Sequence, residues 1–599
     1  MTSSPSGPPS GAPAVALSSG PGYGRADWEH LAAGVLRKSG RLTDDDADVR
    51  VWDKLTRSTL DGIAITPLGT PELVADLVTT GRPDRAGDWD VRGYFPDPDA
   101  KATAADVALD LNNGVTSVWL EVGAGGVAVE DLATALAGVL LDVAPVILDS
   151  ETEPVAAANA FGAFAGSGPL ADGTNLGADP LGALVRSGIE SDVDTVAADV
   201  ARIATGLGCR ALVVDGTAVH DLGASDVGEL GWSLAVGAAY LRSLVAAGYD
   251  VAQAAALIEF RYAATDEQFP TIAKLRAARR GWDRVLELSG VEAGVRRQRQ
   301  HVVTSRPMMS KYDPWVNMLR TTVAAFSAGV GGADAVTVLP FDAHLGLPDV
   351  FSRRNARNTS SLLIHEAHLA RVADMAGGAF AIEKLTDDFA VAGWAEFGLI
   401  EEAGGPAAAV ADGSVRARID AVVTDRERQI AMRKRPLTGL SEFPNLDETL
   451  PERRPYAAGA RTVRPWGHAF EALRDEPATT PVFLATMGTV AAHTARATFA
   501  SNLFAAGGIA TVNPGRNDDV AAVLAAYTGP DGGQPVVCLT GNDKAYAAWG
   551  ADLVAALRGA GAQHVILAGK APEGVEVDAT CAMGLDALDF LNSTREKLA

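Results

Sequence analysis

The feature that most constrains the fold is a series of short apolar runs between residues 91 and 341, separated by longer stretches with helical patterning. Most of these runs are apolar throughout and do not alternate, as is typical of parallel strands covered on both faces. Seven are clear, and the interval between residues 150 and 211 has room for an eighth near GTNLG. Eight such units predict a closed (β/α)8 barrel. The seven clear runs are VRGYF (91–95), SVWLEV (117–122), PVILDS (145–150), ALVVDG (211–216), AALIEFRYA (255–263), HVVTSR (301–306) and AVTVLPF (335–341).

A second group of runs near the C-terminus predicts a smaller α/β domain over residues 481–599. Each run is followed by a helical pattern, and five consecutive βα units are typical of a doubly wound, flavodoxin-like domain. The runs are PVFLAT (481–486), GIATVN (508–513), PVVCLT (535–540), HVILAG (564–569) and the weaker EVDAT (576–580).

The remaining segments complete the expected organisation. Residues 1–24 consist mostly of Ser, Gly, Pro and Ala, and we expect them to be disordered. Residues 25–70 begin with the helical pattern ADWEHLAAGVL and precede the barrel domain, which we place at 71–400. Residues 401–480 carry the basic run RERQIAMRKRPLTGL and several prolines, and we expect a structured linker whose charges are solvated or wrap between domains.

Charge and cysteine content exclude several classes of function. The chain has 51 basic and 75 acidic residues, a net charge of −24, which opposes binding to nucleic acid or to an anionic membrane surface. No run is long enough to span a membrane and the N-terminus has no signal-peptide pattern, so we expect a soluble cytoplasmic protein. Cys209, Cys538 and Cys581 form no metal-binding or disulfide pattern and are interpreted as reduced core residues.

Several longer motifs add a family resemblance. They are LTRSTLDGIAITPL (55–68), AKLRAARRGW (273–282), DPWVNMLRTTVAAFSAGVGGAD (313–334), the block LPDVFSRRN to KLTDDFA (347–390) and RPLTGLSEFPN (435–445). In order and type they resemble the adenosylcobalamin-dependent acyl-CoA mutases, most closely methylmalonyl-CoA mutase. The resemblance implies a barrel that binds acyl-CoA and a cobalamin-binding-type small domain, with the corrin between them. The family also contains enzymes of two unequal chains, a catalytic large subunit and a related small one.

The resemblance implies a D-x-H-x-x-G motif in the turn after the first strand of the small domain. In the family its His is the lower axial ligand of cobalt, and its Asp accepts a hydrogen bond from that imidazole. Aligned on the preceding Met-Gly pair, the Asp position is Val490, the His position is Ala492 and the Gly position is Ala495. All three motif residues are therefore replaced.

Other parts of the same implied site are also altered. His493 is an alternative cobalt ligand one residue further on, but Ala491, two residues before it, cannot accept a hydrogen bond from the ring. We therefore favour a solvated or capping histidine at a helix start. The family's S-x-L element corresponds to CLTGN (538–542), and its Gly-Gly pair to AGK (568–570), where Lys570 adds a long charged side chain. Losses in three loops favour a domain that does not bind cobalamin.

The barrel motifs implied by the resemblance are retained only in part. The W-x-x-R-x-Y stretch is present as WDVRGY and supplies Tyr94. The T-x-Q-N-D stretch reads TNLGAD, one residue longer, so that Gly177 or Leu176 takes the place of Gln. The Tyr-His pair before a Gly-Ala turn reads VHDLGA, with Val219 in place of Tyr and His220 retained.

These losses favour structural roles for the retained barrel residues. Without the Gln beside it, His220 lacks the paired contact that a thioester oxygen requires, so we expect a structural hydrogen bond. His301, with Thr304 and Ser305, matches another family segment and is interpreted as a barrel-strand histidine. Tyr94 is the strongest argument for catalysis, although packing is the simpler role.

The favoured hypothesis is that this chain is the non-catalytic small partner of a homologous catalytic large subunit in a heterodimeric mutase. Adenosylcobalamin would then bind to the large subunit, and this chain would have no working active site and no metal site. The first alternative is a self-sufficient mutase that uses His493, Tyr94 and His220. The second is a binding protein whose barrel holds acyl-CoA and reports its level, or one that supports a related mutase.

Overall fold

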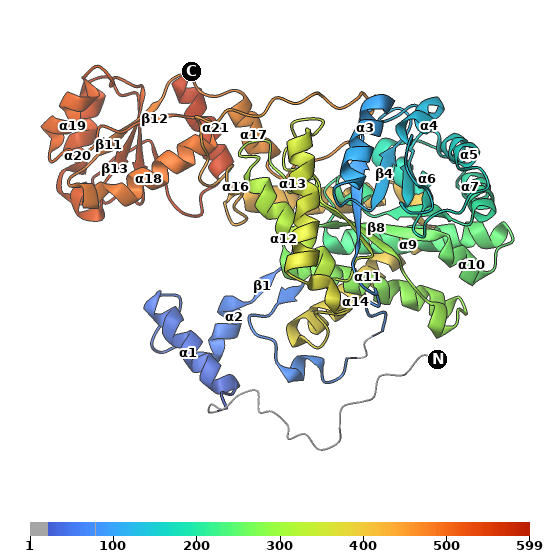
Figure 1. Cartoon of the computed structure of the whole chain (residues 1–599). Helices are drawn as coiled ribbons and strands as arrows, with labels where there is room; N and C mark the ends of the chain where they lie inside the picture. Colours follow the sequence, from blue (N-terminus) through green and yellow to red (C-terminus); the bar gives the residue numbers. More distant parts are fainter. Residues whose placement is uncertain (1–21, 78–79) are drawn as a thin grey trace. The chain divides into compact units, whose positions relative to one another are not determined.

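Eight parallel strands close into a barrel in the computed structural model, which describes residues 22–77 and 80–599 (Figure 1). The strand order around the barrel is β10-β3-β4-β5-β6-β7-β8-β9, so each strand pairs with its neighbour in the sequence and β10 closes on β3. All seven predicted runs contain a strand, and the expected eighth strand is β6. The strands are β3 (Asp90–Phe95), β4 (Ser117–Glu121), β5 (Val146–Asp149), β6 (Asn175–Ala178), β7 (Arg210–Asp215), β8 (Ile258–Ala264), β9 (Gln300–Thr304) and β10 (Ala335–Thr337).

Helices surround the barrel and explain the apolar character of its strands. Every residue of β4, β5, β6, β8 and β9 is buried, because one face of each strand lines the barrel interior and the other contacts helices. The helices of this region are α3 (Ala100–Leu111), α4 (Leu132–Ala135), α5 (Pro154–Ala165), α6 (Pro180–Ser187), α7 (Val193–Leu207), α8 (Thr217–His220), α9 (Asp226–Ala246), α10 (Val251–Ala256), α11 (Gln268–Leu288), α12 (Val316–Val330), α13 (Val350–Ser361) and α14 (Phe380–Glu402).

The segment after α14 combines helices with an extended stretch. Its helices are α15 (Pro406–Ala411), α16 (Ser414–Ala431) and α17 (His468–Asp475). Arg426 of α16 is buried and donates to the carbonyls of Gly223 and Ala224 in the barrel region, so of the two predicted roles this residue of the basic run is not solvated but packs against the barrel. Residues 454–466, which we call the strap, lie against the loops that follow the barrel strands, through backbone hydrogen bonds to Leu347, Asp221 and Pro307.

The C-terminal region is a five-stranded parallel sheet in the order β12-β11-β13-β14-β15. Two apolar clusters lie on its faces, and both include side chains of β11, β13 and β14. Cys538 and Cys581 are buried and free as predicted, whereas Cys209 of the barrel region is only partly buried. The elements are β11 (Val482–Thr486), α18 (Val490–Ala506), β12 (Thr511–Val512), α19 (Val520–Tyr527), β13 (Val536–Thr540), α20 (Asp543–Gly559), β14 (His564–Ala568), β15 (Ala579–Cys581) and α21 (Ala587–Leu598).

A separate N-terminal unit covers the described part of residues 1–59 together with 64–69. It contains α1 (Arg25–Lys38), α2 (Val51–Leu55) and a small antiparallel pair, β1 (Arg57–Ser58) and β2 (Ala64–Ile65). A small core of Ala33, Leu36, Leu42 and Val51 holds its helices together. Residues 1–21 lie outside the described residues, and so does most of the segment expected to be disordered, 1–24. Within 22–77 and 80–599, none of the helices has the length and apolar character needed to cross a membrane.

Candidate functional site

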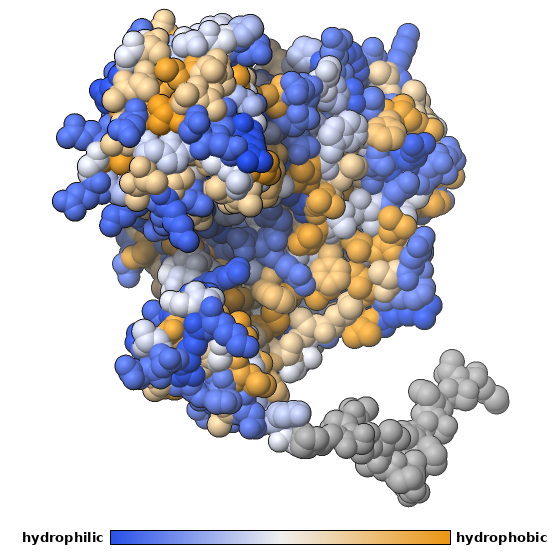
Figure 2. All heavy atoms as spheres, turned by 90° about the vertical axis from the view of Figure 1, so that its left-hand side faces the viewer, coloured by the Kyte–Doolittle hydropathy of each residue, from blue (hydrophilic) through white to orange (hydrophobic). Residues whose placement is uncertain are grey.

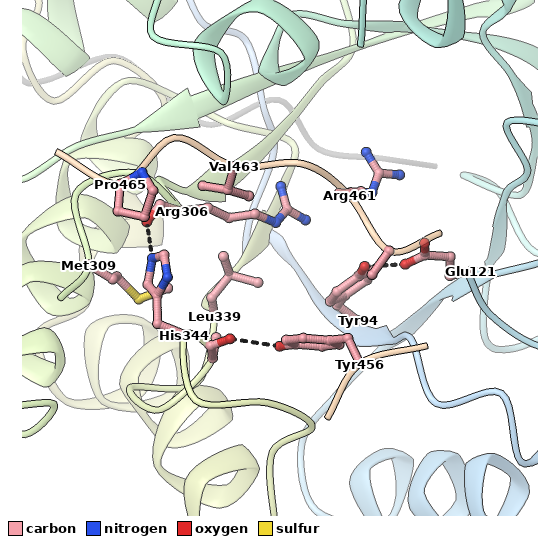
Figure 3. Close-up of a pocket in the computed structure, with 12 residues that line it drawn as sticks. Tyr94, Glu121, Arg306, Met309, Leu339, His344, Tyr456, Arg461, Val463 and Pro465 are labelled. Carbon is pink, nitrogen blue, oxygen red and sulfur yellow. Dashed lines mark hydrogen bonds between the residues drawn. The ribbon is translucent and has the colours of Figure 1, made fainter. Parts of the chain in front are cut away.

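A cavity of about 240 Å³ lies where the barrel strands end, between the strand-end loops and the strap (Figure 3). This end of a β/α barrel is where such folds place their sites, because the loops after all eight strands converge there. Barrel segments contribute Tyr94, Glu121, Arg306, Met309, Leu339, Ala343 and His344, and the strap contributes Tyr456, Ala460, Arg461, Val463 and Pro465.

Tyr94 faces this cavity near the end of β3. Its hydroxyl donates a short hydrogen bond to Glu121, the last residue of β4, and its ring lies 4.3 Å from the indole of Trp119. Burial, followed by the charge of Glu121, raises the pKa of Tyr94 well above its ordinary value. At neutral pH Tyr94 is therefore a neutral phenol held by packing and one hydrogen bond.

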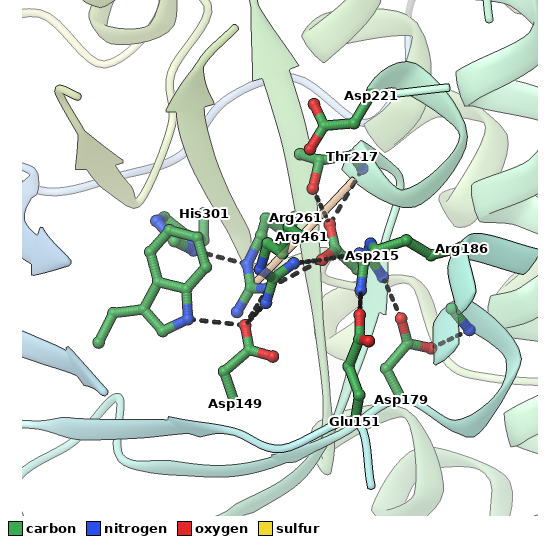
Figure 4. A network of polar contacts seen from close by, with 12 residues as sticks. Asp149, Glu151, Asp179, Arg186, Asp215, Thr217, Asp221, Arg261, His301 and Arg461 are labelled. Atoms are coloured by element: carbon green, nitrogen blue, oxygen red, sulfur yellow. Dashed lines mark hydrogen bonds and ion pairs between the residues drawn. The ribbon is translucent and has the colours of Figure 1, made fainter. Parts of the chain in front are cut away.

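Ion pairs fill the barrel interior next to the cavity (Figure 4). Asp149 ends β5 and Asp215 ends β7, so their carboxylates meet at the same end of the barrel. Arg261 of β8 contacts both carboxylates, at 2.8 Å and 2.9 Å. Arg461 reaches into the barrel from the strap and pairs with both as well, and Arg186 of α6 adds a contact of 2.8 Å to Asp215.

The arginines keep these buried carboxylates charged. Burial alone would raise the pKa of Asp215, but Arg261, Arg186 and Arg461 hold that pKa well below its ordinary value. Burial also raises the pKa of Asp149, but Arg461 and Arg261 lower it, and the net result is a lowered pKa. Buried charges of this kind are tolerated only when they are paired and hydrogen-bonded. The barrel interior at this level is therefore occupied by the protein's own charges.

The two barrel histidines are buried within hydrogen-bonded structure. His220, at the end of α8, has Nε2 at 2.7 Å from the Ser305 hydroxyl, and burial lowers its pKa well below the ordinary value. His301 of β9 accepts from Arg261 Nε at Nδ1 (3.2 Å), so its Nε2 donates to the Thr337 hydroxyl at 2.8 Å. Neither histidine lines the cavity.

The extra residue of the TNLGAD stretch is visible as an irregularity of β6. The pairing of β6 with β7 shifts register between Asn175 and Ala178, and Gly177 has a φ of +71°. A Cβ at Gly177 would lie 1.8 Å from the Leu148 carbonyl oxygen, so no side chain fits there. Leu176 is buried. The irregularity therefore leaves no room for a Gln side chain at Gly177, and the other candidate position is filled by the buried Leu176.

The turn after β11 is short, and α18 begins directly at Val490. Val490 and Ala495 are exposed, and Ala492 offers only a methyl group at the axial-ligand position. His493 is 4% exposed, with Nδ1 at 3.3 Å from the Gly488 carbonyl oxygen. Of the two expected roles, a solvated histidine is therefore wrong, and the ring is packed within the domain against the turn that precedes α18.

Arg496 of α18 occupies the space over the ends of β13 and β14. Its guanidinium donates to the Gly541 carbonyl at 2.8 Å and to Asp543 at 2.5 Å, and it lies 4.8 Å from the centre of the Tyr546 ring. A Cβ at Gly569 would meet this guanidinium at 3.0 Å. The residues present therefore do not fit a cobalamin site, because an alanine replaces the ligand and an arginine lies between the loops that would take the nucleotide tail.

The sequence patterns did not predict the ion pairs at the end of the barrel or the arginine at the end of the C-terminal sheet. Asp149 and Asp215 had a usable signal, since each directly follows an apolar barrel strand in PVILDS and ALVVDG. Arg461 lies in a polar stretch with no periodic pattern, and Arg496 is one basic residue in an Ala-rich helix. Nothing in the local sequence of either arginine indicates what it contacts.

Comparisons with known proteins agree over most of the chain. The family model described as methylmalonyl-CoA mutase matches residues 103–464. The methylmalonyl-CoA mutase small subunit of Streptomyces virginiae is 45% identical over 95% of this chain and 96% of that protein. The small subunit from Propionibacterium freudenreichii subsp. shermanii is 37% identical over 95% and 94%. A methylmalonyl-CoA mutase of Cereibacter sphaeroides is 33% identical over 39% of this chain and 33% of that protein. The chain therefore belongs to the methylmalonyl-CoA mutase family.

Proposed function

We propose that this chain is the non-catalytic small subunit of a heterodimeric methylmalonyl-CoA mutase. It supports a homologous large subunit, which binds adenosylcobalamin and interconverts (R)-methylmalonyl-CoA and succinyl-CoA in the cytoplasm. The relatives that match nearly the whole chain are named small subunits of this enzyme. Binding to the folded large subunit stabilises that subunit by mass action.

The state of the barrel is the observation that carries this proposal. Arg461, whose side chain is 4% exposed, lies inside the strand ends in ion pairs with Asp149 and Asp215. A substrate at this level would have to displace these ion pairs and leave the two carboxylates without that partner. That exchange is unfavourable, since breaking one side of a buried pair costs several kcal/mol, on the order of 3–5.

The C-terminal domain supports the same conclusion. Its strand order, β12-β11-β13-β14-β15, supports a flavodoxin-like domain, which we propose is of the cobalamin-binding type. We assign it, at residues 481–599, a structural role, because Ala492 and Arg496 oppose cofactor binding. His493, the rival ligand, is buried beside Gly488, which opposes a self-sufficient mutase.

The other segments receive roles in the same proposal. Residues 71–400 form the barrel domain and 401–480 the linker that carries the strap, while 25–70 wrap around the large subunit. Apolar side chains gather on the face drawn in Figure 2. Large apolar side chains that stay exposed include Trp315, which precedes α12, Leu319 of α12, and Val350 and Phe351 of α13. Apolar side chains grouped in this way are typical of surfaces that bind another protein.

The test is a titration with adenosylcobalamin in the dark, followed by the visible spectrum. The chain alone is expected to give no spectral change, and binding and turnover are expected only when the large subunit is added. A saturable change with this chain alone that is lost in His493→Ala would contradict the proposal and support the self-sufficient mutase. Stabilisation by acyl-CoA without cobalamin binding would instead support an acyl-CoA-sensing protein.

A further inference from the structure

We propose that the cavity under the strap is a binding site for a free short-chain carboxylic acid, bound as the carboxylate. The site needs no cobalamin and no thioester, so this inference is independent of the proposed subunit role. It follows from two features of the cavity: two arginines each have a donor without a hydrogen-bond partner among the described residues, and several other lining residues are apolar (Figure 3).

Arg306 supplies the main donor. It is 9% exposed, and its Nη1 donates to Asp221 at 3.2 Å. Its Nη2 is buried and, among the described residues, has no hydrogen-bond partner. Figure 3 shows the guanidinium pointing into the cavity toward Tyr94. A buried donor of this kind costs free energy unless an acceptor fills the space beside it, and a carboxylate oxygen matches its geometry and charge.

Arg461 adds positive charge at the same end of the cavity. Its Nη atoms are used by Asp149 and Asp215, while its Nε is buried and has no partner within the described part of the chain. Two guanidinium groups therefore border the space next to Tyr94. Carboxylates are preferred over neutral acceptors in such a place, because both partners of the hydrogen bond are then charged.

Among the carboxylates near this end of the cavity, Glu121 is the one that lines it, while Asp221, Asp149 and Asp215 are held in ion pairs with Arg306 or Arg461. Glu121 receives the Tyr94 hydrogen bond, and its charged neighbours are Arg461, Asp149 and Arg306. Burial, the largest effect, and the charge of Asp149 raise the pKa of Glu121, although Arg461 and Arg306 lower it. The neutral, protonated form of Glu121 is therefore more favoured than that of an exposed glutamate. A carboxylate bound at Arg306 would favour the neutral form further, because two negative charges close together repel each other.

The rest of the lining limits the body of the ligand. The larger apolar lining residues are Met309, Leu339, Val463 and Pro465, and His344 lies beside Met309 with its ring held at the Arg306 carbonyl (Figure 3). About 240 Å³ exceeds the roughly 150 Å³ of a cavity that holds benzene, and it falls short of the roughly 300–1,000 Å³ typical of sites for larger ligands. The volume and lining together fit a carboxylate with a few apolar carbons.

The experiment is isothermal titration calorimetry of the full chain with butyrate, with butyramide as its neutral isostere, and with butyryl-CoA. Saturable butyrate binding, at least tenfold tighter than that of butyramide, is expected. No saturable butyrate binding, or equal binding of the acid and the amide, would overturn the proposal. Tighter binding of butyryl-CoA than of butyrate would also overturn it and assign the site to a thioester.

Two strap variants locate the binding. Ala460 lines the cavity, whereas Ala458 of the same strap is exposed and does not. Ala460→Trp is expected to abolish butyrate binding, and Ala458→Trp to leave it unchanged, with equal melting temperatures showing that both variants fold. Arg306→Lys keeps the charge for Asp221 but loses the planar fork, and is expected to weaken butyrate at least fivefold. Equal affinity in Ala460→Trp and Ala458→Trp would place any binding elsewhere.

Discussion

At the residue scale, function depends on which side chains occupy the two places where the family would hold its ligands. Arg461 fills the barrel and Arg496 fills the end of the parallel sheet. Both are long, cationic and anchored by several hydrogen bonds, so neither place is simply empty. Under the proposed subunit role, such an internal side chain takes over part of the polar contacts that a ligand would otherwise make.

Removing the charge of Arg461 is expected to destabilise the barrel. Arg461→Met leaves Asp149 and Asp215 to share the remaining arginines, and we expect a loss of about 3 kcal/mol in the free energy of unfolding. The measurement is urea unfolding. Arg464→Met is the matched control, because Arg464 pairs with Glu427 at the surface and should cost less than about 1 kcal/mol. Equal losses in the two variants would refute a structural role for the buried pairs.

Asp179 is expected to make stability depend on pH. Burial, followed by the charge of Asp215, raises the pKa of Asp179 from 3.8 to about 7. The folded chain therefore keeps Asp179 protonated up to a higher pH than the unfolded chain does. Below about pH 4 the protonated side chain contributes its full stabilisation to the folded state. As the pH rises to about 7 this contribution is lost, by up to about 1.4 kcal/mol in the free energy of unfolding per pH unit.

The comparison is with Asp179→Asn, whose amide does not titrate. Melting temperatures are measured for both proteins between pH 5 and pH 8. The stability advantage of the original chain over the variant should shrink from pH 5 to pH 7 and then stay level. Parallel curves over this range would show that Asp179 is already ionised at pH 5.

At the element scale, much of the fold could be predicted and most of the site could not. Buried parallel strands are apolar throughout, which is why the barrel strands and the strands of the second sheet were found from composition alone. The inserted residue of TNLGAD indicated a change in β6 but not its form, since a bulge is set by pairing with β7. Arg461 was unpredictable because its partners lie more than 240 residues away in the sequence.

A substitution at Gly177 tests whether the irregular strand β6 can accept a Gln side chain at this position. Gly177→Gln combines a positive φ with a clash against Leu148, and we expect it to cost more than about 3 kcal/mol. Gly188→Gln is the control, since Gly188 has a similar φ of +67° but open space around it, and it should cost about 1 kcal/mol. Thermal unfolding measures both. Similar losses would mean that β6 can adjust its backbone.

At the scale of the whole molecule, buried apolar cores are combined with exposed apolar surface. The barrel strands and both faces of the C-terminal sheet are covered by buried apolar side chains. A protein that only needed to fold would not gain from exposed large apolar side chains on several helices. Under the proposed subunit role, these side chains are available to the large subunit.

Helix α1 gives this idea a specific test. Leu31 is 66% exposed, outside the small core of its own unit. Leu31→Glu is therefore expected to leave the melting temperature of the isolated chain unchanged. If residues 25–70 wrap around the large subunit, the same change buries a charge at the interface and should weaken the complex at least tenfold, about 1.4 kcal/mol.

The matched control for this prediction is Ala26→Glu, which adds the same charge at another exposed position of α1. Affinities for the large subunit are measured by surface plasmon resonance at constant salt. A loss in Leu31→Glu alone would show that the apolar contact matters, because both variants change the net charge equally. Equal losses of affinity in the two variants would point to long-range charge repulsion. If neither variant changes the affinity, the contact surface lies away from α1, and the exposed side chains of α12 and α13 are the next to be substituted.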